Sequence, residues 1–357
     1  MVTRSRVCSK RGGKVSIEIN LPFKLPYDWQ TIIRFYQSHS IPGIERVTEI
    51  SFARVFRIEN TIGFVSVRKS AAKAQLKIRI IPDDPMTILD VVGRVRKMFD
   101  VDCDPTLVAK SFGRIPLLAT LWDRFPGLRQ PKGWDAFETA ICSILGQLVS
   151  AAQRAKLIGQ LVQSYGEEIG DPVSGTKTHL FPSAKVLASC DLSAVKTTIA
   201  RRQAIREFSR RVLSGAISLS DAQDPSNFRR ALLETKGLGP WSAEYISLRA
   251  IGDTDAFPKT DLILKRVLEL HPDLELQLIK PWRSYAAMYL WKEFAQTLSR
   301  SSRVHRGDAD PSSASRKCCS PRSARRTQRG RAATEIRIIS RKARKDRQVK
   351  SSNFLEA

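Results

Sequence analysis

Two short segments of the chain hold residue types that could bind an anion and then act on it. The first, residues 236–241, has the sequence Lys-Gly-Leu-Gly-Pro-Trp and lies between two predicted helices. Its glycines can adopt positive φ and let another backbone approach closely, and its proline fits the first turn of a helix. Amides exposed in such a turn can bind a phosphate, and contacts of this kind position DNA without reading its sequence. An ordinary tight turn between two helices is the alternative interpretation.

The second segment, Phe-Pro-Lys-Thr-Asp, ends at Asp261 shortly after this turn. A phosphate-binding turn alone suggests a DNA-binding module, whereas a turn followed by a carboxylate indicates chemistry on the bound DNA. The alternative role for Asp261 is to cap the following helix, which Thr260 could equally do. Three other carboxylates compete with it: Asp253 and Asp255 are expected in a turn, and Glu244 is expected to face solvent.

The composition of the chain favours a nucleic acid as its partner. Among 357 residues there are 60 Lys and Arg against 35 Asp and Glu, a net charge of +25, and the positive excess persists when residues 299–357 are left out. A hydrophobic content of 42% and this length favour two or three folded domains. No apolar run is long enough to span a bilayer, and the basic residues 1–14 precede no apolar segment, so no secretory signal is expected.

Cysteine and histidine usage argues against a metal centre. The six cysteines are scattered without a C-x-x-C pair, and the chain has four histidines. We therefore expect no zinc site and no iron–sulfur cluster, and a reducing cytosolic compartment.

The hydrophobic pattern predicts an α+β fold with two folded domains and a tail. In residues 15–100, strands are expected at 15–19, 46–59, 63–69 and 75–81, with one helix beginning near residue 28 and another over 85–99. Residues 101–298 have a helical pattern without strands, and helices are expected over 134–150, 151–165, 201–213, 225–235, 241–250, 261–270 and 281–298. Residues 299–357 are rich in Ser, Arg and Lys, which predicts a disordered basic tail that is either merely solvated or a weak DNA-binding arm.

The hairpin segment resembles the helix-hairpin-helix superfamily of DNA glycosylases, in which an aspartate follows a Gly/Pro-rich turn. Within that superfamily the chain is most similar to the DNA-3-methyladenine glycosylase II family. The similarity extends over residues 15–298 and includes five further segments, at 26–29, 125–129, 135–138, 144–150 and 280–286. It implies a TATA-binding-protein-like α+β domain followed by an all-helical helix-hairpin-helix glycosylase domain.

The resemblance also implies a role for Asp261 as the catalytic carboxylate. Cleavage of an N-glycosidic bond builds positive charge on the sugar, and a nearby anion stabilises that charge and can orient or deprotonate the attacking water. An alkylated purine is already cationic, so it leaves without much help from a general acid. The implied contacts to the DNA backbone are Lys236, Gly237, Leu238 and Gly239.

A damaged base must leave the helical stack to reach this carboxylate, and aromatic rings attract a cationic base by about 0.5–2 kcal/mol each. The resemblance implies a base pocket formed by Trp241, Tyr245, Trp282 and Phe35. Core packing is the alternative for each ring, and it is favoured for Phe35. Gln147 and Leu148 resemble the intercalating pair of the family, in which the leucine fills the gap left by the flipped nucleotide. On its own, Leu148 would be interpreted as helix core.

Two positions refine the expected activity. Trp241 stands where strand-cutting members of the superfamily carry a lysine, so a monofunctional enzyme is expected. Leu262 stands where the close relative has a tyrosine, which alters the expected pocket. The predicted function is removal of alkylated bases, of the 3-methyladenine and 7-methylguanine type, from duplex DNA. A non-catalytic lesion-binding protein and a glycosylase for another lesion such as uracil stay open.

The resemblance completes the prediction with cofactors, partners and location. We expect no organic cofactor and no metal site, apart from a possible structural sodium or potassium ion at the hairpin. The expected partner is double-stranded DNA, with no membrane, and the protein is expected to be a monomer. Its expected location is the bacterial cytoplasm, in association with the nucleoid.

Overall fold

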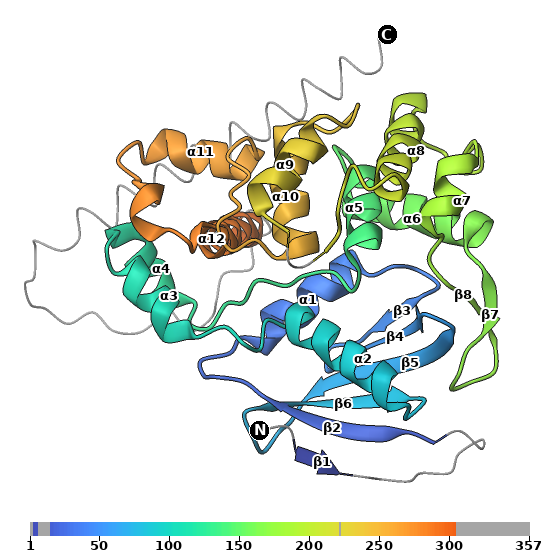
Figure 1. Cartoon of the computed structure of the whole chain (residues 1–357). Coiled ribbons are helices and arrows are strands. Elements are labelled where there is room, and N and C mark those ends of the chain that lie inside the picture. The colour runs from blue at the N-terminus through green and yellow to red at the C-terminus, as the bar shows by residue number, and fades with distance from the viewer. Residues whose placement is uncertain (1–2, 6–14, 221–222, 305–357) are drawn as a thin grey trace, which may run out of the picture. The chain divides into compact units, whose positions relative to one another are not determined.

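A computed structural model describes residues 3–5, 15–220 and 223–304 of the chain (Figure 1). These residues divide into two units. The first holds the described residues up to Asp261 together with Leu274–Tyr289, and the second holds Leu262–Asp273 and the described residues from Leu290 onward. Within the described part of the chain, no helix combines the length and the apolar character needed to cross a membrane.

The first unit begins with a six-stranded antiparallel sheet, which confirms the predicted α+β class (Figure 1). In spatial order its strands are β1 (Thr3–Ser5), β2 (Ile17–Pro22), β6 (Gln75–Ile81), β5 (Thr61–Lys69), β4 (Ser51–Ile58) and β3 (Glu45–Val47). Apolar side chains alternate along β2, β5 and β6, so one face of the sheet is apolar. This face packs against helices α1 (Trp29–His39) and α2 (Pro85–Met98) in one core.

Aspartates begin both of these helices. The carboxylate of Asp28 accepts the N–H of Thr31 over 2.9 Å, and that of Asp84 accepts the N–H of Thr87 over 2.8 Å. Such caps satisfy amides that have no partner inside the helix and typically contribute about 1 kcal/mol. They fix the start of α1, which carries Phe35 and His39 toward the candidate site.

The single strand expected over residues 46–59 is wrong, because the segment forms the hairpin of β3 and β4. The hydroxyl of Thr48 accepts a hydrogen bond from the backbone N–H of Ser51 over 3.1 Å. The backbone N–H of Thr48 donates to the carbonyl oxygen of Ser51 over 2.8 Å. These side-chain and backbone bonds close a turn that strand alternation alone does not reveal.

Helices make up most of the remaining first unit. They are α3 (Pro105–Phe112), α4 (Pro116–Arg124), α5 (Ala136–Leu145), α6 (Ala151–Tyr165), α7 (Ala184–Ser189), α8 (Ile199–Leu213), α9 (Pro225–Leu233) and α10 (Pro240–Ile246). A π-helical segment (Ser247–Ile251) continues α10, and a 3-10 turn (Leu276–Ile279) precedes α12 (Arg283–Val304). The expectation of no strands here is wrong, because β7 (Glu168–Gly170) and β8 (Lys177–His179) form a small antiparallel hairpin.

The second face of the sheet packs against these helices. Val55, Phe64 and Ile81 of the sheet share a hydrophobic cluster with Ile141 of α5 and Leu157 of α6. The second face of the sheet is therefore covered in part, around β4 and β5, and the candidate site forms where α1 and the sheet meet α5, α6 and α10.

The second unit contains α11 (Leu262–Leu270) and α12 from Leu290 onward. The start of α11 agrees with the helix expected over residues 261–270. Helix α12 continues to Val304, past the expected end at residue 298, so the predicted disordered tail does not start at residue 299. The rest of that tail, residues 305–357, lies outside the described residues.

Candidate active site

The turn between α9 and α10 forms the predicted hairpin, and two of its residues are required by the fold. Gly237 has φ of +93°, and a Cβ there would lie 2.8 Å from the Cβ of Ala204. Such a backbone conformation strongly favours glycine. Leu238 is 6% exposed, and its N–H donates to the carbonyl oxygen of Thr235 over 3.0 Å. Leu238 therefore anchors the turn in the core.

Lys236 and Gly239 are exposed in the same turn, as is Gly237. Gly239 has φ of −101°, and a Cβ at this position would meet nothing within 4 Å. Neither its conformation nor its surroundings within the chain require a glycine. The exposed glycine beside an exposed lysine leaves room for an anionic backbone to approach.

Asp261 lies after this hairpin and contacts its first aromatic residue. The indole Nε1 of Trp241 donates to Oδ2 of Asp261 over 3.2 Å. The backbone N–H of Asp261 donates to the carbonyl of Pro258 over 2.8 Å, which closes the turn that ends in the carboxylate. Asp261 is only partly buried, so its carboxylate can be reached from outside.

The competing carboxylates belong to a different network. Asp255 accepts two bonds from the Arg283 guanidinium, of 2.7 and 2.6 Å, and Asp253 is ion-paired with Arg229. Glu244 was expected to face solvent, which is wrong. Its carboxylate accepts the N–H of residue 257 over 3.0 Å and lies 3.6 Å from the Arg229 guanidinium, and burial raises its pKa. These groups hold the segment that leads to Asp261.

Five side chains form a continuous stack next to this carboxylate. Trp241 stacks on Tyr245 at 4.9 Å between ring centroids, with 12° between the planes. The Arg249 guanidinium lies 5.5 Å from the Tyr245 centroid and 4.4 Å from that of Phe35, and Phe35 stacks on His39 at 4.1 Å. Residues four apart follow one another along a helix face, so Trp241 and Arg249 lie on opposite faces of Tyr245.

The predicted pocket residues occupy different positions in this stack. Tyr245 lies between Trp241 and Arg249, and Phe35 lies between Arg249 and His39, so their faces are already covered within the protein. Trp241, at the end of the stack, also contacts the carboxylate of Asp261.

Arg249 and His39 are members of the stack that sequence reasoning missed. Arg249 is 5% exposed, donates to the carbonyl of Pro131 over 2.7 Å, and is carried by the π-helical segment, which periodicity does not reveal. Burial and the nearby Arg154 and Arg249 lower the pKa of His39 to about 3, so its ring is neutral. Nδ1 of His39 lies 2.9 Å from the carbonyl oxygen of Phe35, which can only accept, so Nδ1 carries the proton.

A cavity of about 270 Å³ opens beside the stack. All five members of the stack line it. Its lining also includes the charged residues Glu45, Arg54, Lys132, Glu138 and Arg154. The cavity therefore has an aromatic wall and a polar part, and its volume is close to the lower end of the range for small-molecule sites.

Trp282 does not line this cavity. Its ring packs edge-on against Tyr285, with 5.5 Å between centroids and 71° between planes, and its backbone N–H donates to Ile279 over 2.7 Å. The structure therefore does not bring Trp282 together with the three other predicted pocket residues.

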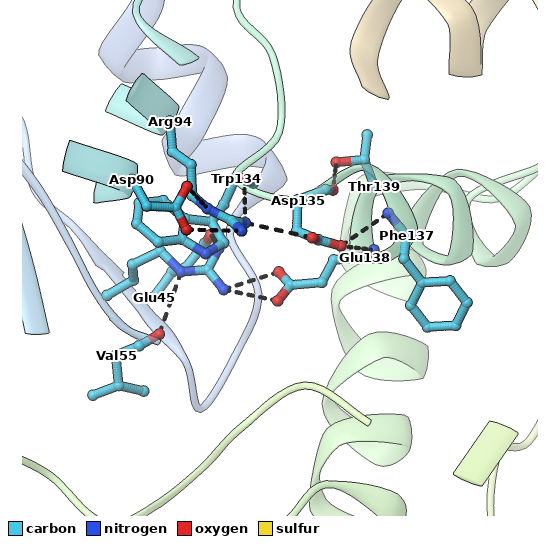
Figure 2. A network of polar contacts seen from close by, with 10 residues as sticks. Glu45, Val55, Asp90, Arg94, Trp134, Asp135, Phe137, Glu138 and Thr139 are labelled. Carbon is cyan, nitrogen blue, oxygen red and sulfur yellow. Dashed lines mark hydrogen bonds and ion pairs between the residues drawn. The ribbon is translucent and has the colours of Figure 1, made fainter. Parts of the chain in front are cut away.

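A buried ionic network forms the polar part of the cavity, and sequence reasoning missed it (Figure 2). Arg54 of β4 is 2% exposed and donates to Glu45 of β3 over 2.8 Å and to both oxygens of Glu138 of α5 over 2.9 and 3.1 Å. The guanidinium groups of Arg54 and Arg94 lie 4.9 and 5.3 Å from the ring of Trp134. Burial raises the pKa of Glu138 to about 7 and also raises that of Glu45. Removing one member of such a buried network typically costs about 3–5 kcal/mol.

The helix expected over residues 134–150 is wrong at its C-terminal end, because α5 stops at Leu145 and Gly146 caps it. Leu148 has φ of +55° and is fully exposed, with a relative exposure of 103%. Left-handed backbone costs a non-glycine residue roughly 1–2 kcal/mol, so helix continuation fails at this point. The predicted wedge residue thus projects from a turn between α5 and α6, and it is not helix core.

Comparisons with known proteins agree with this architecture. Residues 18–135 match the family described as the AlkA N-terminal domain. Over 288 residues the chain is 30% identical to the probable bifunctional transcriptional activator/DNA repair enzyme AlkA of Mycobacterium tuberculosis, covering 77% of this chain and 57% of that protein. It is also 28% identical over 278 residues to DNA-3-methyladenine glycosylase 2 of Escherichia coli, covering 76% of this chain and 95% of the relative.

Among solved structures, the fold is similar to 3-methyladenine DNA-glycosylase from Archaeoglobus fulgidus. The TM-score is 0.64 at 17% identity, over 76% of this chain and 96% of that one. The fold is therefore similar to that of this solved glycosylase. The chain carries an AlkA N-terminal domain and is homologous to DNA-3-methyladenine glycosylase 2. It spans little more than half the length of the tuberculosis relative.

Proposed function

We propose that the chain is a monofunctional DNA glycosylase that flips alkylated bases, of the 3-methyladenine and 7-methylguanine type, out of duplex DNA and removes them by hydrolysis. The observation that carries the proposal is the contact between the Trp241 indole and the Asp261 carboxylate, at the end of an aromatic stack beside a cavity. The homology to a DNA-3-methyladenine glycosylase supports the substrate class.

The flipped base stacks on the outer face of Trp241. This face is favoured because the faces of Tyr245 and Phe35 are covered by Trp241, Arg249 and His39. A base in this position brings its sugar toward Asp261, since the indole N–H already points to that carboxylate. Tyr245 supports Trp241 from behind, so the indole ring is held in place to attract a cationic base.

Asp261 stabilises the positive charge that develops on the sugar as the N-glycosidic bond breaks, and it orients the attacking water. The indole N–H holds the carboxylate in one orientation. Trp241 occupies the place where a lysine nucleophile would start strand cleavage, so hydrolysis without a Schiff base is proposed.

The backbone of the DNA is held by the exposed hairpin residues Lys236 and Gly239, with Gly237 and Leu238 shaping the turn. Leu148 fills the gap left in the duplex. The proposal requires no organic cofactor, and carbonyl oxygens of the hairpin turn are the groups that could hold a monovalent cation. We further propose that the protein acts as a monomer on double-stranded DNA in the bacterial cytoplasm, where it associates with the nucleoid.

The test is release of free bases from methylated duplex DNA, separated and identified by chromatography, with a uracil-containing duplex assayed in parallel. We expect release of 3-methyladenine and 7-methylguanine and intact strands afterwards. Tight binding to methylated DNA without release would instead support a non-catalytic lesion-binding protein. Release of uracil alone would assign a different lesion and contradict the proposed substrate class.

A further inference from the structure

In the turn between α5 and α6, Leu148 adopts a backbone conformation that is unfavourable for leucine. Leu148 combines a left-handed backbone, at φ of +55°, with a fully exposed side chain. A leucine adopts such a conformation only where neighbouring groups hold the backbone in place. The groups that hold this turn therefore determine where Leu148 points.

Two hydrogen bonds connect the preceding residue, Gln147, to two other helices. The guanidinium of Arg201, in the first turn of α8, donates through Nη2 to the carbonyl oxygen of Gln147 over 2.6 Å. The side-chain amide of Gln147 donates to the hydroxyl of Ser242 over 2.7 Å. Ser242 lies in α10 directly after the hairpin and is 4% exposed.

Arg201 is itself held in a defined orientation. Its other terminal nitrogen, Nη1, donates to the hydroxyl of Thr197 over 2.9 Å, just before α8 begins. Arg201 is partly buried, and this burial lowers the pKa of its guanidinium. A charged donor in such surroundings forms a stronger bond to a carbonyl than a neutral donor does.

We propose that Arg201 is a positioning residue for Leu148, and that Ser242 links the same turn to the hairpin. This inference rests on the proposed base-flipping function. Because Gln147 is bonded to Ser242, the hairpin that holds the DNA backbone and the turn that inserts into the duplex form one hydrogen-bonded unit. Contact with a phosphate at the hairpin then sets the depth at which Leu148 enters the duplex.

The proposal predicts a defect that is specific to base flipping. Arg201→Met removes both donors, so Leu148 should lose its fixed orientation while the active site around Asp261 stays intact. We expect single-turnover base release from a fully paired duplex to fall about tenfold. Release from the same lesion in single-stranded DNA should change less than threefold, because an unpaired base needs no wedge to leave the stack.

The matched control is Arg202→Met, which removes the same charge from the adjacent position of α8. It should weaken DNA binding as much as Arg201→Met does without the tenfold loss of release. Arg201→Lys keeps a donor and a charge and should recover part of the rate. Fluorescence of 2-aminopurine placed next to the lesion reports flipping directly, and its rise should be smaller for Arg201→Met than for the control. Thermal unfolding of each variant identifies any variant that fails to fold.

A double-mutant cycle with Leu148→Ala tests whether Arg201 acts by positioning Leu148 or by stabilising the protein as a whole. If Arg201 acts through Leu148, Arg201→Met should cause little further loss in the Leu148→Ala background. Fully additive losses, or equal losses on paired and single-stranded DNA, would overturn the proposal. If the wild-type protein releases no alkylated base from either DNA, the proposed function fails. The fluorescence comparison between Arg201→Met and its control then still tests the positioning role.

Discussion

The two glycines of the hairpin differ in what surrounds them, so alanine at each should separate folding from DNA binding. Gly237→Ala places a Cβ on backbone with φ of +93° and 2.8 Å from the Cβ of Ala204. The left-handed backbone costs roughly 1–2 kcal/mol and the crowding roughly 1–3 kcal/mol, against a gain of about 0.4–1 kcal/mol from a stiffer unfolded chain. The expected net loss in unfolding free energy is about 2–3 kcal/mol.

Gly239→Ala should leave stability almost unchanged. Its φ of −101° is allowed for any residue, and the added Cβ meets nothing within 4 Å. Alanine is a poorer residue than glycine before a helix, but the stiffer unfolded chain offsets this, so we expect a change within about 0.5 kcal/mol. A Cβ would nevertheless stand between the turn and an incoming phosphate. Loss of one charge-assisted bond should weaken DNA binding about tenfold or more.

The assay pairs thermal unfolding of both variants with binding to undamaged duplex at two salt concentrations. A fall in Tm of about 5–10 °C is expected for Gly237→Ala, and no comparable fall for Gly239→Ala. Wild-type affinity in a correctly folded Gly239→Ala variant would refute the assignment of this turn as the DNA-backbone contact. Equal loss of stability in both variants would refute the structural distinction between the two glycines.

The structure also leads to three further predictions. Trp241→Phe keeps an aromatic ring on Tyr245 but removes the indole donor 3.2 Å from Asp261, so single-turnover base release should slow about tenfold with unchanged DNA affinity. Lys236→Ala should reduce the slope of log binding constant against log salt by about 0.9 in a titration with duplex DNA. The folded-state pKa of Glu138, about 7, lies above its ordinary value of 4.5, so ionising it in the folded protein costs free energy as pH rises through this window. Relative to Glu138→Gln, the unfolding free energy of the wild type should therefore fall by up to about 3 kcal/mol between pH 4.5 and 7 in denaturant titrations, and a parallel pH profile for both proteins would contradict the raised pKa of Glu138.

Local sequence signals were sufficient to predict the helices that begin at a capping residue and the strands with regular apolar alternation. Asp28 and Asp84 cap α1 and α2, and the apolar alternation of β5 and β6 identified both strands within a residue or two. The helix before Leu148 was predicted too long, because its apolar residues continue past Gly146 at helical spacing. Only the left-handed backbone at Leu148 reveals that the helix has stopped.

The contacts of the candidate site could be predicted for residues that lie close together in the sequence. Trp241, Tyr245 and Asp261 lie within about 20 residues of one another, and the structure places Trp241 in contact with each of the other two. Arg249 and Arg54 were missed, since the partners that bury them include residues distant in sequence, Phe35 for Arg249 and Glu138 for Arg54. A buried arginine leaves no periodic pattern that distinguishes it from an exposed one.

The most direct test of the account is base release from methylated duplex DNA by the wild type and by Asp261→Asn, with DNA binding measured on the same preparations. Asp123→Asn is the matched control, since it removes the same charge from an exposed carboxylate of α4 that does not line the cavity. The account predicts release by the wild type and the control, and loss by Asp261→Asn with DNA binding retained. Equal release by all three proteins would show that Asp261 only caps a helix, and would contradict its role as the catalytic carboxylate.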